Sequence, residues 1–206
     1  MPISFPVTIQ TMKVSDGPQK YVYYPQVTQL QNRQIEQHIN RTIINHTQKL
    51  MDIQFGNMPS VIVEMVGSFE IKNNQRDILS LTLSNYAYPD RAAHGMTYLE
   101  ALTFNVITGK QYQLKDLFKP GSNYIEIISR IIKEQIKKRD LPIINEFREI
   151  KPDQDFYIAD KTVVIYFQLY DLVPYAYGFP MFPISIYDIQ DIIDENGPLG
   201  KMLAGN

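Results

Sequence analysis

Three histidines and a few acidic pairs are the side chains of this sequence best suited to acid–base chemistry. His94 lies in a polar loop beside Gly95 and close to Asp90 and Arg91. A histidine in such a loop can act as a general base or as a ligand. It can equally do no more than hydrogen-bond to the backbone, so both interpretations of His94 stay open.

Metal binding is not expected from this sequence. His38 and His46 lie eight positions apart, and not at the i, i+4 spacing that holds zinc on a helix. The chain contains no cysteine, which excludes disulfides, thiolate nucleophiles and cysteine-based metal sites. We therefore expect no metal and no cofactor.

No catalytic set is evident among the acids or in known motifs. Glycoside hydrolysis needs two carboxylates across a cleft, and proximity in sequence does not show that arrangement. The close acidic pairs are Asp153 and Asp155, Asp188 and Asp191, and Asp194 and Glu195. Phosphate-binding glycine loops and nucleophile elbows are missing, and Thr108-Gly109-Lys110 is interpreted as a turn. The sequence thus predicts a protein that is not an enzyme.

Aromatic residues offer a different kind of site. The chain has 14 tyrosines and 10 phenylalanines but no tryptophan. Tyrosine combines a broad apolar ring with a polar tip, which suits recognition of proteins or glycans. The candidate ligand-binding residues gather in two loops: Tyr86, Tyr88, His94, Tyr170, Asp171, Tyr175 and Tyr177. The alternative is that these rings only pack the loops together.

Composition restricts the partners and the compartment. Twenty basic and 22 acidic side chains give a formal charge of −2, with no basic stripe for nucleic acid. The N-terminal residues lack the features of a signal peptide, and no apolar run approaches the length of a membrane span. We expect a soluble, cytoplasmic chain as given, or an extracytoplasmic one if an N-terminal anchor precedes it. The oligomeric state is left open.

The hydrophobic periodicity predicts strands in hairpins and two principal helices. Strands are expected at 5–13, 20–27, 60–72, 77–88, 97–107, 156–158, 162–169 and 182–186. One long helix is expected after Asn32, which is a suitable N-cap, and it should stop near Gly56. A second helix is expected after Asn123, with Glu126 completing a capping box.

Smaller features complete the expected topology. Asn73-Asn74-Gln75 should turn one hairpin, a short helix is expected around residues 145–148, and a final helical turn around 187–193. The result is an α+β fold with antiparallel sheets and two principal helices packed on one face. We expect two subdomains packed as one unit, at 1–90 and 91–206.

Several motifs in the C-terminal half occur in a characteristic order. They are Ala92-Ala-His-Gly95, Phe104-Asn-Val-Ile-Thr-Gly-Lys110, Leu114-Lys-Asp-Leu-Phe118, Asp155-Phe-Tyr157 and Pro174-Tyr-Ala-Tyr-Gly178. With them, the chain resembles the RsiV/PdaC-type domain of unknown function of Gram-positive bacteria, over most of residues 60–190. In the anti-sigma factor RsiV this domain lies outside the membrane and resembles a lysozyme sensor; in PdaC it accompanies a separate deacetylase domain.

The resemblance implies a fold and a binding role. No sigma-binding segment or deacetylase domain is evident here, so those activities are not carried over. We expect a non-enzymatic module that binds a protein or a cell-envelope glycan through the His94 and Tyr175 loops. The alternatives are a hydrolase of cell-wall material that uses His94 and Asp171, and a structural component of a bacterial assembly such as a spore layer.

Overall fold

The chain folds into two compact units, seen in a computed structural model that describes residues 5–203. Unit 1 is Met1–Gln111 and unit 2 is Tyr112–Asn206. The boundary therefore lies after the position near residue 90 that the sequence suggested. The boundary lies later because the strand that follows the His94 loop pairs with the sheet of unit 1 along almost its whole length.

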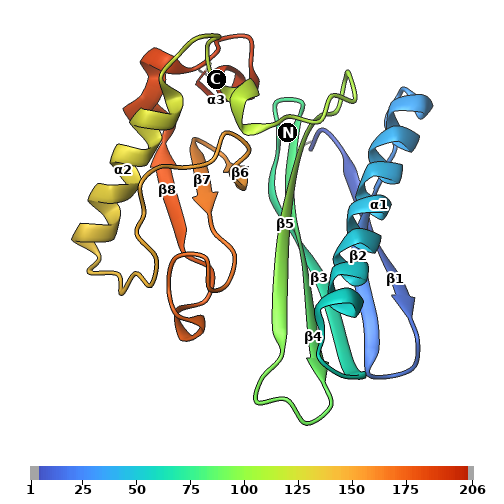
Figure 1. The fold of residues 1–206 in the computed structure, drawn as a ribbon. Coiled ribbons are helices and arrows are strands. Elements are labelled where there is room, and N and C mark those ends of the chain that lie inside the picture. The colour runs from blue at the N-terminus through green and yellow to red at the C-terminus, as the bar shows by residue number, and fades with distance from the viewer. Residues whose placement is uncertain (1–4, 204–206) are drawn as a thin grey trace. The chain divides into compact units, whose positions relative to one another are not determined.

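Unit 1 is built on a five-stranded sheet with the order β1-β2-β3-β4-β5 (Figure 1). The strands are β1 (Thr8–Ser15), β2 (Lys20–Thr28), β3 (Ile62–Gln75), β4 (Ile78–Pro89) and β5 (Met96–Asn105). All neighbours are antiparallel except β2 and β3, which pair in parallel over three residues. A parallel pair needs a crossover connection, and the long helix α1 provides it.

Helix α1 (Arg33–Asn57) begins where the sequence predicted. The side chain of Asn32 accepts hydrogen bonds from the backbone N–H groups of Gln34 and Ile35, which satisfies two of the free donors of the first turn. Ile39, Ile43 and Leu50 form its buried stripe. This stripe packs on alternate residues of β4 and β5, including Leu81 and Leu102, so α1 covers one face of the sheet.

The turn between β3 and β4 lies two residues later than predicted. Arg76 and Asp77 form it, both with positive φ (52° and 62°), and Gln75 pairs directly with Ile78. The right-handed twist of the strands favours two-residue turns of this kind. The predicted turn residues instead extend β3, where Asn74 hydrogen-bonds to both backbone groups of Val7.

Unit 2 contains a three-stranded antiparallel sheet with the order β6-β7-β8. Its strands are β6 (Phe156–Ala159), β7 (Thr162–Tyr166) and β8 (Met181–Ser185), and its longest helix is α2 (Tyr124–Lys138). Short helices complete it: η1 (Leu114–Leu117), η2 (Tyr175–Tyr177), η3 (Ile186–Ile192) and α3 (Pro198–Leu203). Strand β7 is central, as its apolar character on both faces predicted.

Two local predictions for unit 2 are wrong. Asn123 precedes α2, but its side chain makes no capping hydrogen bond, so the capping box with Glu126 does not form. Residues 145–148 are not helical; the whole segment from 141 to 155 is irregular. The segment is held by contacts with distant residues, such as the hydrogen bond from the Ile150 N–H to the buried Ser129 hydroxyl (2.9 Å).

The predicted fold class is confirmed: the chain is a mixed fold of helices and mostly antiparallel strands. In each unit the principal helix packs against the sheet of that unit. In the part of the chain that the structure describes, no helix combines the length and the apolar character needed to cross a membrane.

Candidate functional site

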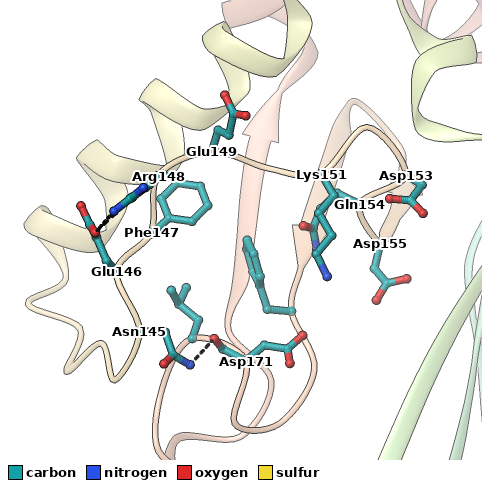
Figure 2. Close-up of a pocket in the computed structure, with 12 residues that line it drawn as sticks. Asn145, Glu146, Phe147, Arg148, Glu149, Lys151, Asp153, Gln154, Asp155 and Asp171 are labelled. Atoms are coloured by element: carbon teal, nitrogen blue, oxygen red, sulfur yellow. Dashed lines mark hydrogen bonds and ion pairs between the residues drawn. The ribbon is translucent and has the colours of Figure 1, made fainter.

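A hollow of unit 2 lies along the irregular 141–155 segment, and we call it the 145–172 pocket (Figure 2). It has a volume of about 650 Å³ and is open to solvent. Its lining residues are Asn145, Glu146, Phe147, Arg148, Glu149, Lys151, Asp153, Gln154, Asp155, Phe167, Asp171 and Leu172. Such a pocket is large enough for a small ligand or for part of a polymer.

Two loop segments are tied together to form this pocket. The backbone N–H of Ile144 donates to the carbonyl of Leu172 (2.9 Å), and the side-chain amide of Asn145 donates to the carbonyl of Asp171 (3.1 Å). The buried amide of Gln154 donates to the carbonyl of Tyr166 at the end of β7 (2.7 Å). The pocket is therefore shaped by bonds between its two loops and by one bond to strand β7.

Phe147 supplies the aromatic surface of the pocket. Its ring packs edge-to-face on Phe167 at a centroid distance of 5.7 Å, and Phe167 packs in the same way on Phe182 of β8, also at 5.7 Å. Phe182 is fully buried, whereas Phe147 is only half-buried. Edge-to-face pairs are favourable beyond the area they bury, so the stack holds the Phe147 ring in one orientation at the surface.

Charges of both signs surround this ring. In Figure 2 the ion pair between Arg148 and Glu146 (2.9 Å) lies to the left, and Asp153 and Asp155 lie to the right. Asp171 lies below the ring in the same view. The pocket can thus offer hydrogen-bond acceptors and donors to one ligand at the same time.

Gln168 connects two of the acids. Its side-chain amide donates to the carboxylate of Asp155 (2.9 Å), and its backbone N–H donates to the carboxylate of Asp171 (3.3 Å). Next to the pocket, burial raises the pKa of the Tyr124 phenol, and the negative charge of Asp153 raises it further. Tyr124 therefore stays neutral and donates to the carbonyl of Pro152 (3.3 Å).

The predicted site residues of unit 1 surround the end of β4. The hydroxyl of Tyr88 donates to the carbonyl of Ala92 (2.8 Å), and Nδ1 of His94 lies 2.9 Å from the carbonyl oxygen of Gly95. Gly95 packs on Tyr86 so closely that an added Cβ would lie 2.4 Å from the ring. These contacts hold the loop in shape; His94 itself is exposed.

The other predicted site residues belong to unit 2. Asp171 lines the 145–172 pocket, while Tyr170, Tyr175 and Tyr177 lie beyond its lining. The rings of Tyr170 and Tyr175 are in contact at a centroid distance of 5.6 Å, and Tyr177 is exposed in η2. His94 and Asp171 lie in different units, so the idea that the two loops face one another stays a prediction.

Sequence reasoning missed most of the pocket. Asn145, Phe147, Arg148 and Lys151 were not considered as site residues, and Asp153 and Asp155 were noted only as a close acidic pair. No local pattern singles these residues out, because residues 145–148 permit a helix. Only the structure shows that the whole 141–155 segment is irregular, and irregular segments of this length are often functional. Within residues 5–203, no group of three histidine or acidic side chains is placed to hold a metal ion.

Comparisons with known proteins support the fold. Residues 115–187, all within unit 2, match the DUF3298 family, described as a protein of unknown function. A DUF3298 family member from Bacteroides fragilis has a similar structure, with a TM-score of 0.70, 11% identity, and coverage of 98% of this chain and 99% of that one. A DUF3298 family protein from Pseudomonas aeruginosa gives a TM-score of 0.65, 13% identity, and 99% coverage of both chains.

No curated protein sequence matches the chain significantly. The two structures have too little sequence identity to show more than a shared fold, which extends over nearly the whole chain. Residues 115–187 of this chain therefore carry the sequence pattern of the DUF3298 family of unknown function, on a fold that solved DUF3298 proteins share.

Proposed function

We propose that this chain is a non-enzymatic binding module that recognises a cell-envelope glycan through the 145–172 pocket. The observation that carries the proposal is the combination of a fixed Phe147 ring with carboxylates, amides and cations around one open hollow. The resemblance to RsiV/PdaC-type domains of Gram-positive bacteria supports an envelope ligand, either a glycan or a protein. The chemistry of the pocket favours the glycan.

The polar groups of the pocket suit sugar hydroxyls. A hydroxyl both donates and accepts hydrogen bonds, so it can bond to the carboxylates of Asp153 and Asp171 and also to Arg148 or Lys151. The C–H face of a pyranose ring is apolar and can lie flat on Phe147. Because Phe147 is already oriented by its contact with Phe167, binding would require little further ordering of the ring.

Binding of peptidoglycan fragments measures this function directly. Soluble muropeptides would be titrated into the full chain and followed by calorimetry, with Phe147→Ala as the test variant. Tyr187→Ala is the matched control, since Tyr187 is an exposed aromatic residue of the same unit outside the pocket. We expect Phe147→Ala to weaken binding about tenfold or more, as loss of an aromatic contact does, and Tyr187→Ala to leave it unchanged.

Two results would oppose the proposal. Absence of saturable muropeptide binding by the unmodified chain would exclude a cell-envelope glycan as the ligand of the pocket. Binding of an envelope protein that Phe147→Ala weakens would keep the pocket but change the class of ligand.

A hydrolase of cell-wall material is the second candidate, because three aspartates line one pocket. Asp153, Asp155 and Asp171 are the kind of groups that act as acid, base or nucleophile at a glycosidic bond. Purified chain incubated with peptidoglycan would then release reducing ends, and Asp153→Asn or Asp171→Asn would abolish the release. A binding module releases none, with or without these substitutions.

A further inference from the structure

Strand β1 forms an open edge of the sheet in unit 1. The sheet order begins with β1, and within residues 5–203 its only strand neighbour is β2 (Figure 1). Every residue from Thr8 to Ser15 is paired with β2 in a regular antiparallel register. Such an edge has one row of backbone N–H and C=O groups that point away from the sheet.

The hydrogen-bond pattern identifies the residues of that row. At the hairpin end, the N–H of Asp16 donates to the carbonyl of Lys20 (2.8 Å), which makes these two residues a hydrogen-bonded pair. Bonded pairs alternate along an antiparallel ladder, so residues 8, 10, 12 and 14 bond to β2. The backbone groups of Ile9, Thr11, Lys13 and Ser15 therefore point outward.

Strand β2 gives an independent check of this alternation. Val27, the partner of Ile9, should then have its backbone groups pointing away from β1. Both groups are in fact bonded by the side chain of Asn40, at 2.8 Å each. Pro25, which has no N–H to donate, is opposite Thr11 in the same outward series.

Backbone groups that point outward from another edge strand are covered by side chains. On β8, Gln135 and Arg139 of α2 donate to the carbonyls of Pro183 and Met181, at 2.8 Å each. By contrast, within residues 5–203 no hydrogen bond is made to the outward backbone groups of Ile9, Thr11, Lys13 and Ser15. The β1 edge is thus available for a further strand.

A small apolar pocket lies at the hairpin end of this edge. It has a volume of about 100 Å³, which suits one aliphatic side chain, and its apolar lining includes Val14, Tyr21, Met51, Phe55 and Met65. Val14 and Phe55 are 44% and 57% exposed, which is high for apolar side chains flanking a pocket. An added strand whose side chain faces Val14 would place that side chain beside this pocket.

We propose that β1 takes up an extended peptide segment of a partner protein as a sixth strand of the sheet. Backbone hydrogen bonds to Ile9, Thr11, Lys13 and Ser15 supply affinity, and the pocket beside Val14 selects an apolar residue. Lys13 is the only charged residue of β1, and its ammonium lies over the Tyr21 ring (5.1 Å from the centroid), so an acidic residue opposite it is favoured.

A second copy of this chain suits the edge less well. Two β1 strands could pair antiparallel, but β1 contains no acidic residue to place opposite Lys13. When all four outward residues pair, Gln10 of the second copy lies opposite Val14, and glutamine suits an apolar pocket poorly. This inference concerns unit 1 alone and does not depend on the glycan pocket of unit 2.

A synthetic peptide with the sequence Thr-Val-Leu-Glu-Thr-Val-Thr-Val, blocked at both ends, tests the proposal. In an antiparallel strand, its leucine faces Val14 and its glutamate faces Lys13. Titration into the full chain, followed by amide NMR, should shift the amides of Ile9, Thr11, Lys13 and Ser15 and slow their hydrogen exchange. The amides of Gln10 and Met12, already bonded to β2, should keep their exchange rates.

Thr11→Pro and Thr11→Val form the matched pair of variants. Proline removes an outward N–H and no bond to β2, and strand edges tolerate it at such positions. We expect Thr11→Pro to weaken the peptide about tenfold or more, equivalent to at least one hydrogen bond, and Thr11→Val to bind normally. A third variant, Phe55→Ser, should remove the preference for leucine over serine in the peptide.

Three outcomes would overturn the proposal. The first is no exchange protection at the four outward amides with peptide at millimolar concentration. The second is equal binding to Thr11→Pro and Thr11→Val. The third is a dimer of the free chain in sedimentation that Thr11→Pro dissociates, because the second copy would then occupy the edge.

Discussion

Replacing Glu100 by glutamine tests how α1 is fastened to β5. One carboxylate oxygen of Glu100 lies 2.6 Å from Nδ1 of His46 and accepts a hydrogen bond from Nζ of Lys49 (2.9 Å), both on α1. The Glu100 side chain is 17% exposed, whereas that of Lys49 is 58% exposed and therefore more strongly screened. The bond to His46 should contribute most of the stabilisation.

The expected loss follows from these contacts. Burial alone raises the pKa of Glu100, but the hydrogen bonds and charges of His46 and Lys49 outweigh it, so the pKa lies below its ordinary value of 4.5. A hydrogen bond to a charged group contributes about 1.5–3 kcal/mol, and an exposed ion pair well under 1. We expect Glu100→Gln to lower the free energy of unfolding of unit 1 by about 2 kcal/mol at neutral pH.

The loss should depend on pH with a defined sign. Because the folded-state pKa is lowered, the Glu100 contribution is fully present above the unfolded value near 4.5 and disappears as pH falls through the folded value. The difference between wild type and Glu100→Gln should therefore shrink steadily below pH 4.5.

Urea unfolding followed by circular dichroism, with amide exchange of α1 as the readout specific to unit 1, measures both effects. Glu70→Gln is the control, since Glu70 has a lysine partner but is 70% exposed, and it should change stability by less than about 0.5 kcal/mol. A Glu100→Gln loss that is the same at pH 7 and pH 3, or no larger than that of Glu70→Gln, would refute this reasoning.

Three further predictions concern residues of unit 1, each measured by urea unfolding. Asn32→Ala should cost about 1 kcal/mol because two capped N–H groups of α1 lose their acceptor, and Asn32→Asp should retain most of the stability. Gly95→Ala should cost about 1–3 kcal/mol, since its Cβ would lie 2.4 Å from the Tyr86 ring, whereas Gly56→Ala, with no atom near, should not destabilise. Asn85→Leu should preserve or raise stability, because within residues 5–203 neither polar atom of the buried Asn85 side chain has a partner; a loss above about 2 kcal/mol would show that the amide is satisfied.

Predictions that rest on local sequence patterns were the most reliable ones. The four-residue spacing of Ile35, Ile39 and Ile43 and the N-cap Asn32 predicted α1, because both depend only on residues within a few turns. The alternation of Leu79, Leu81 and Leu83 predicted β4 for the same reason. Gly109 marked a turn that the structure confirms, with φ of +77° and a bond from its N–H to the Asn105 carbonyl.

Predictions failed where distant segments decide the outcome. The parallel pairing of β2 and β3 depends on how α1 crosses the sheet, which periodicity does not reveal. Within the irregular 141–155 segment, a short helix was predicted around residues 145–148 because the local residues permit one. In the fold the polar groups of the segment bond instead to Ser129, Tyr166 and Leu172, which lie far along the chain or in another element.

The sequence by itself determined the class of the fold, the extent of α1 and most hairpins, and the lack of cysteine chemistry, since these follow from composition and from neighbours along the chain. Only the tertiary structure assembled the 145–172 pocket, because Phe147 is oriented by Phe167 and Phe182 and because Asn145 is tied to Asp171. Likewise, only the strand order and the alternation of hydrogen bonds show that β1 has an open edge. Residue types can suggest chemistry, but long-range contacts decide which residues share a site.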